Sequence, residues 1–275
     1  MIETPRLDRV TLLLYGLVGL FSMIILLPML YMIMVAFKSR TSMFMDPLGW
    51  PDSLTFEAFE RAWGVGIATF LVNSTLITFL SVVVIILVSG MAAYALVRMK
   101  GRLGKLIYLM IVAGFAIPMQ AVLVPLFQII SGAGMINERF AIVLPYAGYG
   151  IPFTVILFYA FLLDFPRELE EAARLDGCSR FQTFTRIILP LSGPAIASAA
   201  IFQSVFVWNE FILALLTLTS PEMKTLPVGI LQLKGEYTSD WPAMMAGLTL
   251  ATLPLLVIFI FAQKYFVRSL AGLGK

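Results

Sequence analysis

Three neighbouring residues, Trp208, Asn209 and Glu210, combine an aromatic ring, an amide and a carboxylate inside an apolar stretch. A site for sugar hydroxyls needs amides or carboxylates beside a flat aromatic face, and this trio offers that chemistry. Polar groups within apolar spans are costly, so they usually have a partner or face a cavity. We expect the residues that could line a solute path to be Asn73, Gln120, Tyr149, Gln203, Trp208, Asn209 and Glu210. Amides also join membrane helices by hydrogen bonds, and Glu210 is expected to act in helix packing or gating.

The sequence has few of the residues that catalysis usually requires. The sequence has no histidine, which removes the commonest general base, proton shuttle and metal ligand. Its single cysteine, Cys178, permits no internal disulfide and no cluster of paired thiolates, so no metal site is expected. No Gly-x-x-x-x-Gly-Lys-Ser/Thr segment is present to hold ATP phosphates, and no catalytic residues are predicted. A net charge of +3 does not indicate a nucleic-acid partner.

The segment 164–190 has a definite internal order. Pro166 suits a first helical turn, and acidic residues directly after it favour the positive end of a helix dipole. Gly177 predicts the end of that helix, because glycine tolerates a left-handed backbone. Ser179 and Gln182 have the spacing of a capping box and predict a second short helix that ends at Leu189-Pro190. The result is a helix–turn–helix elbow with an alanine-rich knob, which suits either docking on another protein or simply covering the ends of other helices.

The elements around these residues are predicted to be membrane helices. The chain has 275 residues, of which 60% are hydrophobic and 13% charged, and the apolar residues occur in long blocks. A bilayer core of about 30 Å needs about 20 helical residues. Since only helices or closed barrels span lipid, the fold class is all-α, with a single transmembrane domain over residues 1–275. The six predicted spans lie near Thr11–Phe37, Ala68–Ala95, Leu106–Ile130, Ala141–Leu163, Ser192–Leu218 and Ala243–Phe266.

The distribution of positive charge predicts the orientation. With six spans, the segments on the side of the two termini hold thirteen lysines and arginines, and the opposite segments hold six. The positive-inside rule therefore places both termini in the cytoplasm, together with the elbow. The first apolar run is too long for the roughly 7–15 residues of a signal-peptide core, and we expect it to be retained.

The elbow resembles the coupling motif of bacterial ABC importer permeases. The shared anchors, at matching spacing, are Glu171-Ala172-Ala173, Gly177, Ile187 and Leu189-Pro190. Further similarity to the carbohydrate branch of that family, and to its six-span subunit of the maltose-system G type, covers nearly the whole chain. It is carried by Asn73-Ser74, the run Ser89–Leu96, Pro118-Met119-Gln120, Trp208-Asn209-Glu210-Phe211 and the run Gln263–Arg268. The tail 269–275 matches the family loosely.

The resemblance implies a subunit of a sugar or polyol importer in the bacterial inner membrane. Its expected partners are a second permease, two copies of a cytoplasmic ATPase, an extracytoplasmic solute-binding protein and membrane lipid. ATP and Mg²⁺ would be bound by the ATPase, and no cofactor by this chain. The residues that the resemblance assigns to ATPase coupling are Glu171, Ala172, Ala173, Leu175, Asp176 and Gly177.

Two other functions compete with this interpretation. A stand-alone secondary transporter usually has internal repeats and ionisable residues within its spans, whereas here only Glu210 is a plausible intramembrane acid and no repeat is visible. An intramembrane enzyme would need a nucleophile–base pair or an acid dyad, and the spans contain neither.

Overall fold

The computed structural model describes residues 8–99, 101–235 and 239–272. These residues form helices and contain no strand beyond one isolated bridge between Lys234 and Ser239, so the predicted all-α class is confirmed. The chain divides into two compact units. The first combines Met1–Ile67 with Ile230–Thr252, and the second combines Ala68–Gly229 with Leu253–Lys275.

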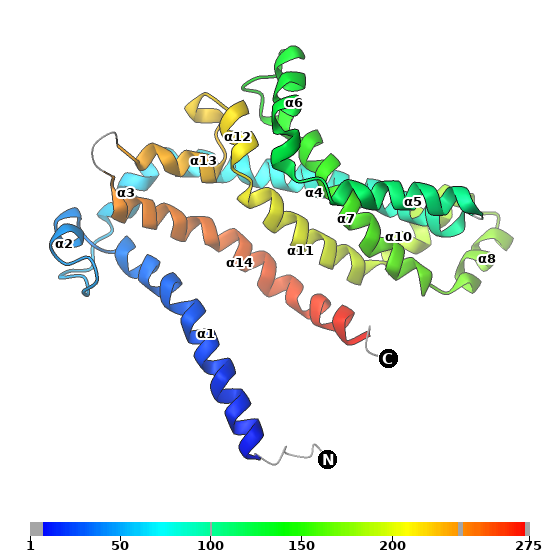
Figure 1. Ribbon diagram of the computed structural model, residues 1–275, viewed down its shortest axis with the longest axis horizontal. Helices are drawn as coiled ribbons and strands as arrows, with labels where there is room; N and C mark the ends of the chain where they lie inside the picture. The colour runs from blue at the N-terminus through cyan, green and yellow to red at the C-terminus, as the bar shows by residue number, and fades with distance from the viewer. Residues whose placement is uncertain (1–7, 100, 236–238, 273–275) are drawn as a thin grey trace. The chain divides into compact units, whose positions relative to one another are not determined.

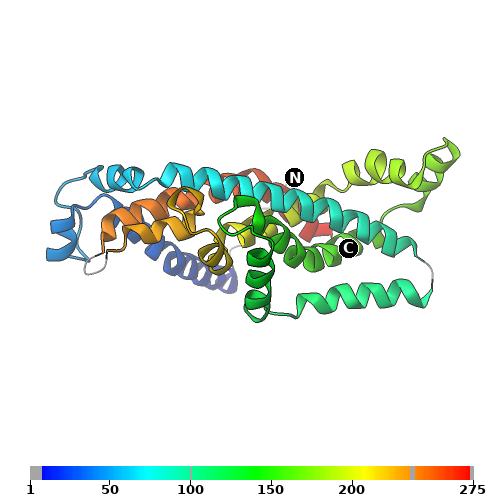
Figure 2. The same ribbon diagram turned by 90° about the horizontal axis from the view of Figure 1, so that it is seen from above.

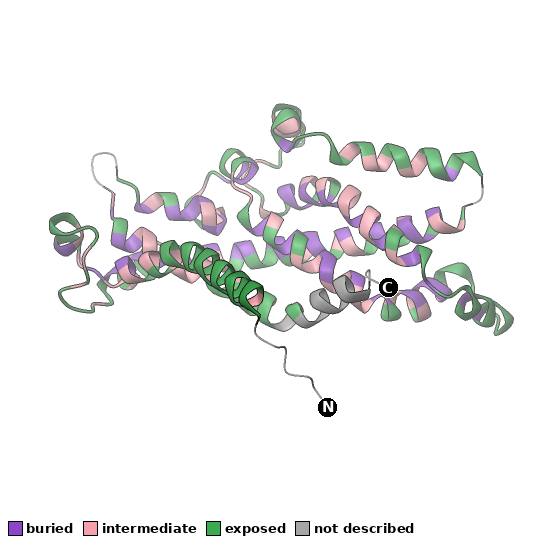
Figure 3. Ribbon diagram, turned by 60° about the horizontal axis from the view of Figure 1, so that its bottom comes forward, coloured by how far each residue is buried: buried purple, intermediate pink, exposed green. Residues whose placement is uncertain are grey.

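The first unit contains a long apolar helix, α1, and the folded segment between α1 and α4, which we call the outer segment. Its helices are α1 (Arg9–Ala36), α2 (Arg40–Met45), α3 (Glu57–Gly64), η4 (Leu231–Leu233) and the beginning of α14 (Trp241–Gly272). Most residues of α1 are exposed along its whole length, as the green ribbon in Figure 3 shows. An apolar helix without a covering layer requires lipid or another protein around it.

The second unit contains the remaining helices. In chain order they are α4 (Ile67–Arg98), α5 (Arg102–Phe115), α6 (Met119–Gly132), η1 (Arg139–Ile142), α7 (Val143–Leu163), α8 (Arg167–Leu175), α9 (Arg180–Thr183), η2 (Phe184–Ile188), α10 (Leu189–Leu191), α11 (Gly193–Asn209), α12 (Ile212–Thr217), η3 (Pro221–Met223) and α13 (Leu226–Ile230). Both α5 and α11 pack against α7, which makes α7 the central helix of this unit (Figure 1).

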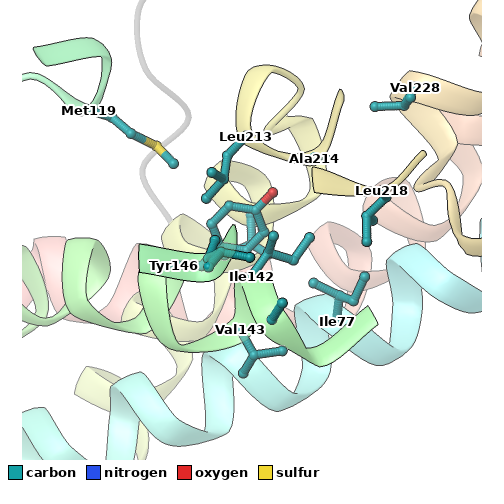
Figure 4. Close-up of a cluster of buried hydrophobic side chains, with 12 residues drawn as sticks. Ile77, Met119, Ile142, Val143, Tyr146, Leu213, Ala214, Leu218 and Val228 are labelled. Carbon is teal, nitrogen blue, oxygen red and sulfur yellow. The ribbon is translucent and has the colours of Figure 1, made fainter. Parts of the chain in front are cut away.

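Two buried clusters hold the second unit together. One gathers α4, the start of α7, and α12 around the fully buried Tyr146, with Ile77, Ile142 and Leu213 beside it (Figure 4). The other surrounds Phe158 and joins the C-terminal end of α4 to α7 and the elbow. Burial of each large apolar side chain contributes about 1.5–3 kcal/mol relative to exposure in water, although lipid reduces this gain.

The number of spans depends on how bent helices are counted. Among the described residues, four helices are long and apolar enough to cross a membrane, and six candidates result if each of two bent pairs counts as one span. The helical stretches coincide with the six predicted regions, within several residues at their ends.

Two of the predicted continuous spans are broken. The third, expected near Leu106–Ile130, divides into α5 and α6, which meet at 93° just before Pro118 caps α6 (Figure 2). Proline has no N–H to donate, and it disfavours helical geometry in the preceding residue, so the bend lies where the sequence breaks the hydrogen-bond ladder. The fifth, expected near Ser192–Leu218, ends as α11 at Asn209 and resumes as α12.

Candidate functional site

The first limb of the elbow is α8, and its C-terminal end closes as the sequence predicts. The N–H of Cys178 donates to the carbonyl of Ala173 at 2.9 Å, and the N–H of Gly177 donates to that of Arg174 at 3.0 Å. This pair of bonds is the Schellman motif, which needs a left-handed residue directly after the helix. Gly177 supplies it with a φ of +80°.

The second limb starts at the predicted capping box. Ser179 Oγ accepts from the N–H of Gln182 at 3.3 Å, and Gln182 Oε1 accepts from the N–H of Ser179 at 2.8 Å. The limb continues through η2 and α10 and ends at Leu191, one residue beyond the Leu189-Pro190 end that the sequence predicts. It then bends by 76° into α11. Within this limb η2 is a π-helical turn, and the N–H of Leu189 donates to the carbonyl of Phe184 at its end.

The residues that the elbow exposes differ from those of the expected alanine-rich knob. Ala173 is buried, whereas Ala172 is exposed and Leu175 is 90% exposed at the tip of α8. Leu175 is the most exposed large apolar side chain of the elbow, ahead of Phe181 at 67% and Leu169 at 42%, and it lies close in sequence to the exposed Ala172, Glu171 and Asp176. A side chain so open to solvent at a helix end is available for contact with another protein.

The other face of α8 is anchored by an ion pair that the sequence did not reveal. Glu170, only 3% exposed, accepts from Arg98 Nε at 2.8 Å and 3.0 Å, and from Arg98 Nη2 as well. The hydroxyl of Tyr94 donates to the same carboxylate at 3.4 Å. These groups line a cavity of about 760 Å³ inside the elbow.

In the first unit, two arginines converge on one buried carboxylate. Asp240 accepts from Arg40 Nη2 at 2.5 Å and from Arg61 Nε at 2.7 Å, and it also accepts from the N–H of Ala243 in the first turn of α14. Burial acts to raise the pKa of Asp240, but the hydrogen bonds from Arg61 and Arg40 outweigh it and hold that pKa below its usual value. Nearby, the fully buried Lys38 donates to the carbonyls of Asp46 and Pro47 at 2.7 Å and 3.3 Å. Asp240 and Lys38 therefore stabilise the outer segment of this unit.

Three of the predicted solute-path residues are buried in the second unit. Asn73 Nδ2 donates to the carbonyls of Glu222 and Lys224, both at 2.9 Å. Gln203 Nε2 donates to the carbonyl of Gly150 at 3.1 Å and to Thr154 Oγ1 at 2.9 Å. Both amides thus join segments of the second unit, as the helix-packing alternative expects. The third, Trp208, is also buried.

Glu210 lies at the break between α11 and α12. Its Oε1 accepts from the N–H of Leu213 at 2.9 Å and its Oε2 from the N–H of Ala214 at 3.2 Å, so it caps the short helix α12. The hydroxyl of Tyr146 on α7 donates to the same carboxylate. The side chain therefore couples α7 to the point where the fifth predicted span breaks.

Gln120, Tyr149 and Asn209 are the more accessible members of the predicted set. Gln120 and Asn209 are exposed, while Tyr149 is half-buried. The ring of Tyr149 stacks on that of Phe206 with centroids 5.3 Å apart, and its hydroxyl accepts from the N–H of Met119 at 3.2 Å. Phe206 and Asn209 are three residues apart on α11, so they share a helix face. The arrangement places amides near a flat aromatic pair.

Metal ligands are not brought together in the part of the chain that the structure describes. No group of three or more histidine, cysteine, aspartate or glutamate side chains lies close enough there to hold a metal ion. Cys178 is a free thiol, partly accessible at the turn of the elbow.

Residues 85–272 match the family described as the binding-protein-dependent transport system inner membrane component. The chain belongs to this family. The matched range includes the elbow and the candidate solute-path residues on α6, α7 and α11. The structural features that define the elbow are thus features of an inner-membrane transport subunit.

Two relatives align with this chain over most of its length and most of their own. The probable ABC transporter permease protein YurM of Bacillus subtilis is 39% identical over 246 residues, which are 89% of this chain and 82% of the relative. The probable starch degradation products transport system permease protein AmyC of Thermoanaerobacterium thermosulfurigenes is 34% identical over 248 residues, 89% and 90% of the two chains.

The fold has a counterpart among solved structures. A chain from a bacterial ABC transporter involved in the import of the acidic polysaccharide alginate superimposes with a TM-score of 0.81 at 23% identity. The match covers 97% of this chain and 100% of the other. It shows that the chain has the fold of an ABC importer permease.

Sequence reasoning missed the charged contacts that organise both units. In the sequence, Arg98 is one of the thirteen positive charges on the side of the termini, and Arg40, Arg61 and Lys38 are among the six on the opposite side. The one local signal was the spacing of Gly90, Tyr94 and Arg98, which places them on one face of α4. The partners lie far away in sequence, so no spacing rule identifies them.

Proposed function

We propose that this chain is one of the two permease subunits of an ABC importer for a sugar or related polyol. It forms half of the translocation path and receives solute from an extracytoplasmic binding protein. Two copies of a cytoplasmic ATPase bind ATP and Mg²⁺ and hydrolyse ATP, while this chain hydrolyses none. Both termini and the elbow lie in the cytoplasm. The sugar class is supported by the similarity to AmyC, a probable permease for starch degradation products, and by the amide and aromatic groups of Gln120, Asn209, Tyr149 and Phe206.

The elbow is the observation that carries this proposal. Its first limb ends in a left-handed glycine, Gly177, and presents Leu175 to solvent. A helix tip with one apolar anchor and acidic neighbours fits a groove on a partner, in the manner of helix-in-groove recognition. Its second limb continues through a helical backbone to Leu191. Movement of the docked tip would therefore reach the membrane helices through defined secondary structure. In the proposed docking surface, Leu175 is surrounded by Glu171, Ala172 and Asp176. Ala173 is buried and packs within its own subunit.

For the solute path we propose Gln120, Tyr149 and Asn209 as the residues that contact solute. Gln120 and Asn209 are exposed. Gln120 directly follows Met119, whose N–H donates to the Tyr149 hydroxyl, and Asn209 follows Phe206 by three residues on α11. Asn73, Gln203 and Trp208 are buried, and Glu210 accepts from the backbone of α12, so these four instead maintain the helices around the path. Asn209 donates to the carbonyl of Val205 at 2.8 Å, but this bond lies within its own helix and the side chain stays exposed.

The test compares two substitutions at Gly177 in the affinity-tagged chain, purified in mild detergent from its native host. The φ of +80° strains any side chain, and an added Cβ meets no atom within 4 Å, so backbone geometry alone decides the effect. Valine is disfavoured there by about 1–3 kcal/mol, whereas asparagine tolerates the left-handed region. We expect Gly177→Asn to retain the co-purifying ATPase and Gly177→Val to lose most of it.

Mass spectrometry of the co-purifying chains decides between the candidate functions. A second permease and an ATPase are expected with the unmodified chain. Recovery of the chain alone, folded and without an ATPase, would contradict the proposal and favour a secondary transporter. Full ATPase recovery with Gly177→Val would contradict the role of the elbow.

A further inference from the structure

One face of α4 contacts both limbs of the elbow. Gly90, Tyr94 and Arg98 are four residues apart, so their positions lie nearly above one another along the helix. They occupy the last third of α4, which ends at Arg98. The elbow is joined covalently only to α7, which precedes it, and to α11, which follows it, whereas α4 reaches it through side chains alone.

The contact with the first limb is a buried, charge-assisted one. Arg98 holds Glu170 through both Nε and Nη2, and Tyr94 donates to the same carboxylate. The exposed fractions of the two charged side chains are 17% and 4%. Ion pairs exposed on a surface contribute little, but removal of one partner from a buried pair leaves an uncompensated charge and is strongly unfavourable.

The contact with the second limb is aromatic. The ring of Tyr94 stacks on Phe184, the first residue of η2, with centroids 5.8 Å apart and an interplanar angle of 26°. One turn earlier, a Cβ added to Gly90 would lie 3.4 Å from Cζ of Phe184. Phe184 therefore lies within van der Waals reach of α4 at Gly90 as well as at Tyr94. Tyr94 contacts both limbs at once, through its hydroxyl and through its ring.

We infer that Arg98, Glu170 and Tyr94 form a clamp that fixes the elbow to the cytoplasmic end of α4. Arg98 and Glu170 are positioning residues for transport, because they transmit movement of α8 directly to α4. The inference rests on the proposed function for its role in transport, whereas the clamp itself is a property of this chain. Without the clamp, displacement of α8 would reach the membrane only through α7 and α11.

The test uses isosteric and conservative variants in the intact importer complex in lipid nanodiscs. Glu170→Gln removes the charge and keeps the shape, and Arg98→Lys keeps a charge but removes the two-nitrogen geometry. Glu168→Gln is the matched control, since Glu168 is exposed on the same turn of α8. Hydrogen–deuterium exchange of the backbone amides is followed in residues 167–178 and 84–98, without nucleotide and with ATP, Mg²⁺ and vanadate.

Without nucleotide, we expect about a tenfold faster exchange of the α8 amides in Glu170→Gln, a smaller increase in Arg98→Lys and none in Glu168→Gln. With trapped nucleotide, the α4 amides should change their exchange in the unmodified complex and in Glu168→Gln. That change should be lost in Glu170→Gln while the ATPase remains bound. Exchange in α8 that is identical in all variants would overturn the clamp.

A nucleotide response in α4 that survives Glu170→Gln would overturn the transmission role. If instead no ATPase is recovered with the unmodified chain, the proposed function fails, and the α8 exchange without nucleotide still decides whether the clamp exists.

Discussion

At the scale of single residues, Asp240 binds arginines from two helices, Arg40 of α2 and Arg61 of α3. It is 7% exposed, accepts from Arg61 and Arg40, and caps the first turn of α14. Hydrogen bonds to a charged group contribute about 1.5–3 kcal/mol when well formed, although Arg40 is largely exposed and adds less. The carboxylate therefore links α2 and α3 to the start of the last helix.

Asp240→Asn is expected to lower the free energy of unfolding by about 1–3 kcal/mol at neutral pH. Because the folded-state pKa of Asp240 lies below its usual value, the stabilisation is complete above the unfolded pKa of about 3.9 and disappears as the pH falls through the folded value. Thermal unfolding in detergent from pH 7 to pH 3 should show a constant difference between the two proteins above about pH 5, which shrinks below about pH 4. Asp52→Asn, at an exposed position, is the control. A difference independent of pH over this range would contradict the role of the charge.

At the scale of elements, the helices of the second unit are positioned by close approaches that only small residues permit. A Cβ added to Gly150 on α7 would lie 2.6 Å from Cδ1 of Ile85 and 2.7 Å from Oε1 of Gln203. Gln203 is the amide that joins α11 to α7 through Gly150 and Thr154. A methyl group at position 150 would therefore require the side chains of Ile85 and Gln203 to move.

Gly150→Ala is expected to destabilise the protein by about 1–3 kcal/mol, because the methyl group displaces Gln203 and breaks two hydrogen bonds. Gly148→Ala on the same helix is a matched control, since a Cβ there meets no atom within 4 Å. It should be neutral or stabilising by up to about 1 kcal/mol through helix propensity. Thermal unfolding of both variants in the same detergent measures the difference. Equal stabilities would show that α7 and α11 separate more readily than the structure indicates.

At the scale of the whole molecule, the central expectation is the orientation in the membrane. The positive-inside rule places the elbow in the cytoplasm and the segment between α1 and α4 on the opposite side. Leu48 lies in that outer segment and is 82% exposed, and Glu168 is exposed on α8. Each can be replaced by cysteine in a Cys178→Ser background, where the introduced thiol is the only one in the chain.

A membrane-impermeant maleimide should label Leu48→Cys in right-side-out vesicles and Glu168→Cys only in inverted ones. The label reports a side of the membrane and does not depend on transport. Labelling of both positions from the same side would contradict six spans with both termini in the cytoplasm. The reverse assignment would contradict the orientation but not the number of spans.

The sequence by itself determined the features that depend on local or bulk physics. Apolar blocks long enough to cross lipid predict membrane helices, because every backbone polar group in lipid needs an internal partner. Gly177 and the Ser179–Gln182 pair predicted the turn of the elbow, since caps involve residues only a few positions apart. Pro118 could also have indicated the bend between α5 and α6, because its effect is equally local.

Only the tertiary structure decided which polar side chains are buried and which remain accessible to solvent. Asn73 and Asn209 have the same chemistry, yet one is buried against backbone carbonyls 149 and 151 residues away and the other is exposed. Arg98 and Glu170 are 72 residues apart and meet only because α4, α7 and the elbow share one core. Spacing rules reach about one helical turn, whereas these contacts depend on how entire helices pack. For that reason the sequence indicated the family and the elbow, and the fold determined how the elbow is held.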